Sequence, residues 1–348
     1  MKADNPFTLT FGKTPGEYIP RYEKTQEILD TFSGTNPVSQ TYLIEGIRGS
    51  GKTVLMTAIA KELASSEKWI VVNLNMTRDL MEDLAVKLSE KCSKLLPDLA
   101  KTGFSISVAG FGLGLNAPAS VQNYSGVISE LLSRLQKKKK RVLITIDEVS
   151  NSRTMKEFAS EFQIFLREDY PLFLIMTGLY ENIYNVQNDP SLTFLLRSPK
   201  LSLEPLSIAQ ITKQYAHIFH IEKEPASYLA GITKGYAFAF QALGMLYYEY
   251  RDDLPVDEIL SKLDDMLDDF VYRKIWDGLS TTDRQILKVL SDEPMRVNQV
   301  CEKLNMSSSS FSTYRKRLIN RGLINGKQHG YVSLALPRFA EVIDYYHS

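Results

Sequence analysis

The stretch Gly46-Ile47-Arg48-Gly49-Ser50-Gly51-Lys52-Thr53 has the spacing G-x-x-x-x-G-K-T, the Walker A pattern of phosphate-binding loops. Its glycines allow a tight turn that brings successive backbone N–H groups close to phosphate oxygens. We expect Lys52 to reach the β- and γ-phosphates and the Thr53 hydroxyl to ligate Mg²⁺. The pattern therefore predicts a nucleotide site formed by Gly46, Arg48, Gly49, Ser50, Gly51, Lys52, Thr53 and Val54.

The segments on both sides of this loop favour the same interpretation. Residues 41–45 are a β-prone apolar run, and residues 54–63 carry apolar side chains at helical spacing. The loop then opens a helix whose positive end faces the phosphates. The alternative, a glycine-rich turn that binds no ligand, does not require this strand–loop–helix order.

A second motif follows about 95 residues later, within the range for this class of nucleotide-binding protein. Residues 141–146 form a continuous apolar run, typical of a strand buried on both faces of a parallel sheet, and it ends in Asp147-Glu148. Carboxylates at the carboxyl end of such a strand lie where open α/β sheets bind ligands. We predict Asp147 as the Mg²⁺ partner and Glu148 as the catalytic base for an attacking water. The alternative is that two acids simply end a strand.

Further strands are expected at residues 69–74, 172–177 and 200–203, separated by helical segments. Strands that alternate with helices imply crossover connections and a parallel sheet. The predicted fold class is therefore α/β, with a P-loop NTPase sheet and helices on both faces in a domain covering residues 1–205. Thr177, at a strand's carboxyl end, is a candidate contact for the γ-phosphate or the attacking water, or an ordinary strand end.

Two period-two runs joined by a short turn predict a β-hairpin insertion at residues 103–116. Such a hairpin contacts a partner or folds against its own domain. Residues 206–280 have apolar positions three and four apart throughout, which predicts a helical lid domain. Its expected helices are residues 208–219, 225–233, 238–251 and 256–274.

The last segment, residues 281–348, is predicted to be a winged helix-turn-helix domain. Thr282 is a candidate cap for a helix to residue 290, residues 297–304 form a second, and Ser307 opens a third that stops at Gly322. A short hairpin follows. The predicted outward face of the third helix carries hydroxyls and cations suited to phosphates and base edges, namely Ser309, Ser312, Thr313, Arg315, Lys316 and Arg317.

Charge patterning supports a nucleic-acid role for this segment alone. It has ten Lys/Arg residues against six Asp/Glu, whereas the 348-residue chain has 41 of each and no net charge. Double-stranded DNA is therefore a predicted partner. Winged helices also act as protein-interaction modules, so a protein partner is the alternative. Only Cys92 and Cys301 are present, no signal peptide opens the chain, and no apolar stretch reaches transmembrane length. We expect a soluble cytoplasmic protein with no membrane partner.

Together these motifs resemble P-loop ATPases of the AAA+ superfamily, near archaeal origin-recognition initiators and STAND signalling ATPases. The resemblance covers nearly the whole chain. It implies an adenine-side box at Ile19, Pro20 and Arg21, and an arginine finger or switch arginine at Arg197, acting on its own or a neighbouring subunit's nucleotide. Residues 234–238 look like the family's lid motif, although Ala237 replaces its proline and no arginine stands at the second sensor position.

These observations predict a Mg²⁺-dependent ATPase that binds ATP and ADP and couples nucleotide state to DNA binding. The predicted catalytic residues are Lys52, Glu148, Thr177 and Arg197. The alternative hypothesis is a signalling or assembly scaffold. There ATP is a structural or switch ligand, and the winged helix serves a protein partner or self-association.

Overall fold

A computed structural model describes residues 4–10, 16–95 and 123–346 of the chain. The hairpin predicted at residues 103–116 lies outside these described residues. The chain divides into two compact units. The sheet unit consists of Arg21–Glu45 and Thr53–Ser202. The helical unit consists of Met1–Pro20, Gly46–Lys52 and Leu203–Ser348.

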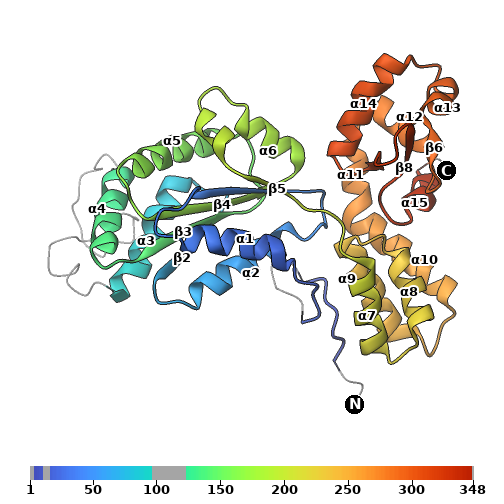
Figure 1. Cartoon of the computed structure of the whole chain (residues 1–348), viewed down its shortest axis with the longest axis horizontal. Helices are drawn as coiled ribbons and strands as arrows, with labels where there is room; N and C mark the ends of the chain where they lie inside the picture. The colour runs from blue at the N-terminus through green and yellow to red at the C-terminus, as the bar shows by residue number, and fades with distance from the viewer. Residues whose placement is uncertain (1–3, 11–15, 96–122, 347–348) are drawn as a thin grey trace, which may run out of the picture. The chain divides into compact units, whose positions relative to one another are not determined.

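Five parallel strands form the centre of the sheet unit, in the order β2-β3-β4-β1-β5 (Figure 1). They are β1 (Thr41–Glu45), β2 (Trp69–Leu74), β3 (Arg141–Ile146), β4 (Leu172–Gly178) and β5 (Lys200–Ser202). Every residue of β1 and β4 is buried, and so is every residue of β3 after Arg141, as the apolar run of residues 141–146 predicted. The predicted α/β fold with a parallel sheet is confirmed.

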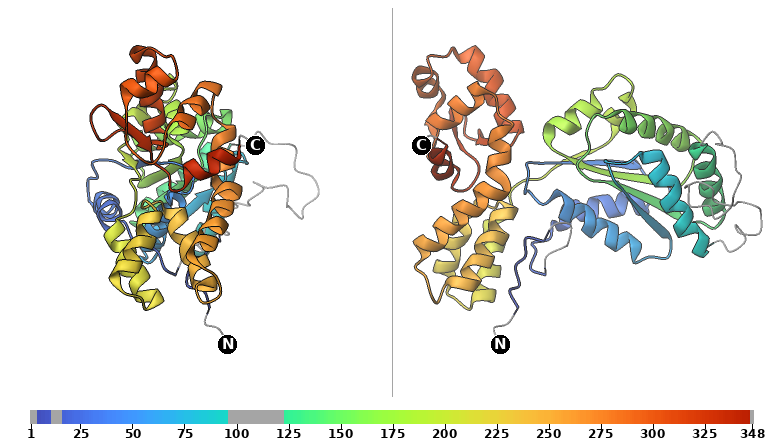
Figure 2. Two further views of the ribbon diagram at one scale, coloured as in Figure 1. Left: turned by 90° about the vertical axis from the view of Figure 1, so that its right-hand side faces the viewer. Right: turned by 180° about the vertical axis from the view of Figure 1, so that it is seen from behind.

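Helices cover both faces of this sheet, as Figures 1 and 2 show. One face is covered by α1 (Tyr22–Ser33) and α2 (Lys52–Ala64), and the other by α3 (Leu80–Leu95), α4 (Tyr124–Lys137) and α5 (Arg153–Arg167). The chain then adds α6 (Tyr180–Gln187) and the 3₁₀ turn η2 (Thr193–Arg197). In α5 an apolar stripe that includes Phe158, Phe162 and Phe165 is buried against the sheet.

The strand order brings three carboxyl ends together. Ile44 near the end of β1 pairs with Thr177 of β4, and Ile146 at the end of β3 pairs with Met176 of β4. The loop after β3 therefore begins beside the end of β4. Ligands of open α/β sheets bind at this edge.

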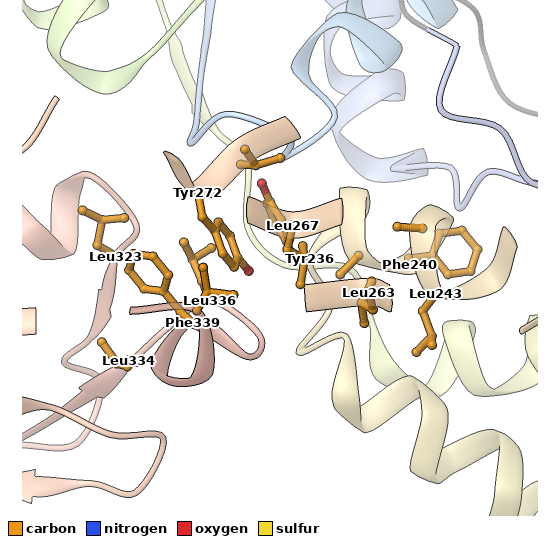
Figure 3. Packing of buried hydrophobic residues seen from close by; sticks show 14 of the residues in the cluster. Tyr236, Phe240, Leu243, Leu263, Leu267, Tyr272, Leu323, Leu334, Leu336 and Phe339 are labelled. Carbon is orange, nitrogen blue, oxygen red and sulfur yellow. The ribbon is translucent and has the colours of Figure 1, made fainter. Parts of the chain in front are cut away.

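The helical unit is built around one hydrophobic cluster that joins its lid helices to its carboxyl-terminal part (Figure 3). Its lid elements are α7 (Ile208–Phe219), α8 (Lys223–Ile232), α9 (Ala237–Tyr250), α10 (Val256–Leu267), the π-helical turn η3 (Asp268–Tyr272) and α11 (Arg273–Asp277). Four predicted helices are thus present, but the one expected at residues 256–274 contains a π-helical turn. No described helix is long and apolar enough to cross a bilayer.

The carboxyl-terminal part has three helices, a small antiparallel sheet and a further helix. Its helices are α12 (Thr281–Val289), α13 (Val297–Lys303), α14 (Ser308–Asn320) and α15 (Phe339–Tyr345), and its strands β6 (Met295–Arg296), β7 (Ile324–Asn325) and β8 (Tyr331–Leu334). The strand order is β6-β8-β7. Neither β6 nor α15 was predicted.

One predicted cap in this part is wrong. Ser280, not Thr282, caps α12, because its side chain accepts a hydrogen bond from the Asp283 N–H while the Asp283 carboxylate accepts from the Ser280 N–H. This reciprocal capping box satisfies two backbone donors at the start of the helix. Ser307, in the serine run expected to open the third helix, accepts from the Ser310 N–H and caps the start of α14.

The amino-terminal segment packs on the lid helices. Phe7 is 3% exposed, and its ring lies 5.9 Å from that of Tyr215 and 5.7 Å from those of Phe219 and Phe240. Gly244 of α9 leaves the room that this ring needs, because a Cβ there would overlap it.

Candidate nucleotide-binding site

The backbone of the phosphate-binding loop is a tight turn. The N–H of Ser50 donates a hydrogen bond to the carbonyl oxygen of Ile47 at 3.2 Å. Gly49 has a φ of +74° and Gly51 a φ of +92°, a region that glycine enters without steric cost. The glycines predicted from the Walker A pattern therefore stand where the chain requires them.

Lys52 is the first residue of α2, and its side chain bonds back to the start of the loop. Its side chain is largely buried, and its Nζ donates to the carbonyl oxygens of Gly46 and Ile47, both at 3.0 Å. These bonds hold a positive charge at the start of the loop. An ammonium group in this place suits the phosphate oxygens of a nucleotide.

Two residues of the predicted lid motif donate hydrogen bonds to carbonyl oxygens of the same loop. The Tyr236 hydroxyl donates to the carbonyl oxygen of Arg48 at 2.5 Å, and the Phe238 N–H donates to the carbonyl oxygen of Gly49 at 3.1 Å. Both residues lie in the predicted lid motif at the start of α9. The lid motif thus contacts the loop through one side-chain hydroxyl and one backbone N–H.

In the sheet unit, three predicted residues converge on one carboxylate. The Thr53 hydroxyl donates to Asp147 Oδ2 at 2.7 Å, and the Thr177 hydroxyl donates to Asp147 Oδ1. Thr177 is fully buried and Asp147 is half-buried. The Walker A threonine, the acid after β3 and the polar residue of β4 therefore form a single hydrogen-bonded set.

Glu148 follows this carboxylate with an unusual backbone. Its φ is +52°, and its N–H donates to Asp147 Oδ1 at 3.0 Å. A non-glycine residue in the left-handed region is strained by about 1–3 kcal/mol, and such residues cluster at functional sites. The next residue, Val149, donates its N–H to the Thr177 carbonyl oxygen at 2.8 Å, which ties this turn to β4. Glu148 itself is exposed, so its carboxylate is accessible to a water molecule.

The residues around Asp147 fit a Mg²⁺ ion bound with a nucleotide. Carboxylate and hydroxyl oxygens are ligands that Mg²⁺ accepts, and it usually takes only one or two protein ligands together with phosphates and waters. Among the described residues, no group of three or more His, Cys, Asp or Glu side chains could hold a metal by itself. A magnesium site that depends on the nucleotide's phosphates is consistent with both observations.

The residues implied by the family resemblance belong to both units. Ile19 is buried in the hydrophobic cluster of the helical unit, next to Pro20. Arg21 belongs to the sheet unit, where it directly precedes α1. Arg197 is exposed at the end of η2, beside the exposed Leu196. Their roles at a nucleotide stay predictions.

The six residues predicted to contact DNA do not all face solvent. Ser309, Ser312, Thr313 and Lys316 are exposed on α14. Arg315 instead donates to the Gly326 carbonyl oxygen at 3.1 Å, and Arg317 pairs with the buried Asp283 of α12. Both arginines thus make contacts inside the helical unit. Residue spacing placed them on the helix but could not show these partners.

Tyr236 contacts the phosphate-binding loop although its sequence position gave it no predicted role. It stood within the lid motif at residues 234–238, but no role was assigned to its side chain. A tyrosine directly after a glycine in that motif was the available signal. Its hydrogen bond joins residues 188 positions apart, which spacing alone does not predict.

Comparisons with known proteins concern the fold of the whole chain. The fold is similar to that of the ORC2 protein of Aeropyrum pernix in its ADPNP-ADP complexes, with a TM-score of 0.61 and 17% identity over 97% of this chain and 96% of that chain. For the ADP form of that protein, the TM-score is 0.51 and the identity 15%, over 94% and 95% of the two chains.

A STAND protein with a tetratricopeptide repeat sensor from Pyrococcus horikoshii matches with a TM-score of 0.43 and 16% identity, over 97% of this chain and 44% of that chain. The family described as "Domain of unknown function (DUF8462)" matches residues 269–343. No curated protein matches the chain. The chain thus has a fold similar to that of the archaeal ORC2 protein, as the resemblance implied.

Proposed function

We propose that this chain is a Mg²⁺-dependent ATPase that acts as a molecular switch, and that its winged-helix part binds double-stranded DNA. The observation that carries the proposal is the hydrogen bond between Thr53 and Asp147, which joins the two nucleotide-site motifs across 94 residues. A chance glycine-rich loop has no reason to place its threonine against the acid that follows another strand of the sheet, here β3, which β4 separates from β1. The ADPNP and ADP of the Aeropyrum pernix ORC2 structure support an adenine nucleotide as the ligand.

Each residue of the site has a separate task in this proposal. Lys52 and the loop N–H groups bind the β- and γ-phosphates. Thr53 and Asp147 would hold Mg²⁺, which neutralises phosphate charge as the bond to the leaving group breaks. Thr177 keeps the Asp147 carboxylate oriented through its hydroxyl. Glu148 orients the attacking water and accepts its proton, so that the products are ADP and inorganic phosphate.

The substitution Glu148→Gln tests this assignment. We expect turnover to fall about 10²- to 10⁴-fold, because an amide cannot accept the proton from water, while ATP still binds. Phosphate release and equilibrium binding of a fluorescent ATP analogue measure the two effects. Glu168→Gln is the matched control, because Glu168 is an exposed carboxylate at the end of α5. Equal phosphate release by wild type and Glu148→Gln would remove Glu148 from the catalytic role.

A scaffold with a protein-binding winged helix is the second candidate function. It is favoured by the contacts of α14, where Arg315 and Arg317 bind groups within the helical unit. Lys316 is then the exposed cation among the six predicted DNA contacts. The two functions separate in a titration with duplex DNA. A switch that binds DNA shows affinity that falls steeply with salt, whereas a scaffold shows no duplex affinity beyond that of a neutral control protein.

A further inference from the structure

We propose that Tyr236 is a positioning residue for the phosphate-binding loop, because its hydroxyl fixes the direction of the Arg48–Gly49 peptide and thereby aims the Gly49 N–H at bound phosphate. This inference rests on the proposed function, since it concerns how the same site binds ATP. It assigns a task to a side chain that neither Walker motif contains.

The loop geometry shows which peptide is held. Residues 47–50 form a β-turn closed by the hydrogen bond from the Ser50 N–H to the Ile47 carbonyl oxygen. Gly49 is the third residue of this turn, and its φ of +74° is that of a type II turn. Types I and II differ by about 150° in the ψ of the second residue, so they point the central peptide in different directions. That central peptide is the one between Arg48 and Gly49.

Tyr236 binds this central peptide by its oxygen. The hydroxyl donates to the Arg48 carbonyl at 2.5 Å. In a planar trans peptide the C=O and the N–H point to opposite sides. A hydroxyl that fixes the carbonyl on the outer side of the loop therefore fixes the Gly49 N–H toward the inner side, where loop amides meet phosphate oxygens.

The hydroxyl is suited to act only as a donor here. Tyr236 is 6% exposed, and this burial raises the pKa of its hydroxyl well above the ordinary value, although the charge of Arg48 acts in the opposite direction. The group therefore keeps its proton over the physiological pH range. A carbonyl oxygen can only accept a hydrogen bond, so the Tyr236 hydroxyl is the donor in this contact.

The ring of Tyr236 packs beside the ring of Tyr272 in the hydrophobic cluster (Figure 3). It stacks on Tyr272, with centroids 6.5 Å apart and planes 25° apart. Tyr272 in turn donates its hydroxyl to the Pro337 carbonyl oxygen at 2.6 Å and packs on the ring of Phe339 at 4.8 Å. Tyr236 thus belongs to a row of ring contacts that ends in the winged-helix part, and these ring contacts do not require the Tyr272 hydroxyl.

Gly49 is shaped to receive this hydroxyl. A Cβ at residue 49 would overlap the Tyr236 hydroxyl and lie 3.0 Å from the Phe238 Cβ. The missing side chain therefore serves the close approach of the lid as well as the positive φ. The Phe238 N–H donates to the Gly49 carbonyl oxygen at 3.1 Å, and this second contact holds the following peptide, between Gly49 and Ser50.

Removal of the hydroxyl has a defined consequence. Without it, the central peptide populates both directions, and the apparent dissociation constant rises by the inverse of the fraction that remains correctly oriented. One neutral hydrogen bond shifts such an equilibrium about two- to tenfold. The chemical step depends on other residues, so kcat stays close to that of the wild type while KM rises.

The test compares Tyr236→Phe with Tyr272→Phe in the full chain. Both variants lose one buried hydroxyl from the same aromatic row, but only Tyr236 contacts the loop. We expect Tyr236→Phe to weaken Mg²⁺·ATP and Mg²⁺·ADP binding about two- to tenfold and to raise KM with kcat unchanged. Tyr272→Phe should bind both nucleotides as the wild type does. Calorimetric titration, steady-state kinetics and thermal melting measure binding, turnover and folding.

The outcomes are distinguishable. Weaker binding by Tyr236→Phe alone, with both variants folded, supports the positioning role. Wild-type affinity in Tyr236→Phe, or an equal loss in both variants, overturns it and leaves the proposed function intact, because the wild type still binds ATP. If the wild type itself binds no Mg²⁺·ATP, the proposed function is wrong, and this inference fails with it.

Discussion

At the residue scale, the candidate site depends on a glycine and a threonine as much as on charged residues. Gly49 combines a positive φ with close approach of the lid, and Thr53 reaches Asp147 at 2.7 Å. Sequence spacing identified both residues. It identified Gly49 as a turn residue, however, and not as a contact of the lid, because Tyr236 is distant in the chain.

The substitution Gly49→Ala tests both requirements. We expect it to destabilise the fold by about 1–3 kcal/mol, because the new Cβ forces a strained backbone and overlaps the Tyr236 hydroxyl. ATP binding should fall further than in Tyr236→Phe, since the turn itself is displaced. Urea unfolding and ATP titration measure the two effects.

Gly231→Ala is the matched control. Gly231 lies within α8, and a Cβ there meets no atom within 4 Å. Alanine is a better helix former than glycine, so this variant should gain about 0.5–1 kcal/mol of stability. If Gly49→Ala matched the stability and affinity of the wild type, the close approach of Tyr236 to the loop would be wrong.

At the element scale, α14 has two differently used faces. One face is bound to the rest of the helical unit by Phe311 and Leu318, which are fully buried, and by Arg317, which pairs with Asp283. The other presents hydroxyls and Lys316 to solvent. The sequence predicted the helix and its start at the serine run, but its periodicity could not tell a structural arginine from an exposed lysine.

We therefore predict different effects for neighbouring cations of α14. Lys316→Ala should weaken duplex DNA binding and reduce the salt dependence of log K by about one unit, because one phosphate contact is lost. Arg317→Ala should instead lower stability by about 1–2 kcal/mol, because the 1%-exposed Asp283 loses an ion-pair partner. Fluorescence anisotropy at several salt concentrations and chemical unfolding distinguish these effects.

Lys223→Ala provides the control for Lys316→Ala. Lys223 is also an exposed lysine of the helical unit, but it begins α8 of the lid. This variant should bind duplex DNA like the wild type. Duplex affinity that does not change on Lys316→Ala would contradict DNA binding through α14 and favour the scaffold.

At the scale of the whole molecule, the lid and the winged-helix part share one hydrophobic cluster within the helical unit. Polar contacts add to it. Lys234 pairs with Asp292 at 2.6 Å, and Arg338 forms two hydrogen bonds with Asp264 of α10. Since these pairs join residues far apart in sequence, a change at one end of the unit alters the stability of the whole unit.

The variant Arg338→Met tests this coupling through its pH dependence. Burial raises the pKa of the 5%-exposed Asp264 carboxyl, and the Arg338 guanidinium opposes that effect. A carboxyl with a raised pKa favours the folded state most at low pH, and this contribution is lost as pH rises through its folded pKa. Without Arg338 the pKa rises further, so the variant should lose about 3 kcal/mol at pH 7 and less near pH 4.

Thermal melting of wild type and variant across this pH range measures the difference. Asp264→Asn in the Arg338→Met background is the control, because it removes the titrating group and should remove the extra pH dependence. A stability difference that is the same at pH 4 and pH 7 would show that Asp264 is not the group responsible.

The sequence by itself determined the parallel sheet, the succession of strands and helices along the chain, and the two nucleotide motifs. These features follow from patterns within short stretches, such as the buried apolar run of residues 141–146 and the glycine spacing of residues 46–51. The winged-helix pattern was also local, although the short strand β6 and the helix α15 were too brief to stand out.

The tertiary structure alone decided which side chains meet. The bond from Tyr236 to Arg48, the Thr177 hydroxyl on Asp147 and the pairing of Arg317 with Asp283 all join separate elements. Periodicity tells which face of a helix or strand is buried, but not which partner lies against it. That partner depends on how the elements pack in three dimensions, and a linear spacing carries no direct record of that packing.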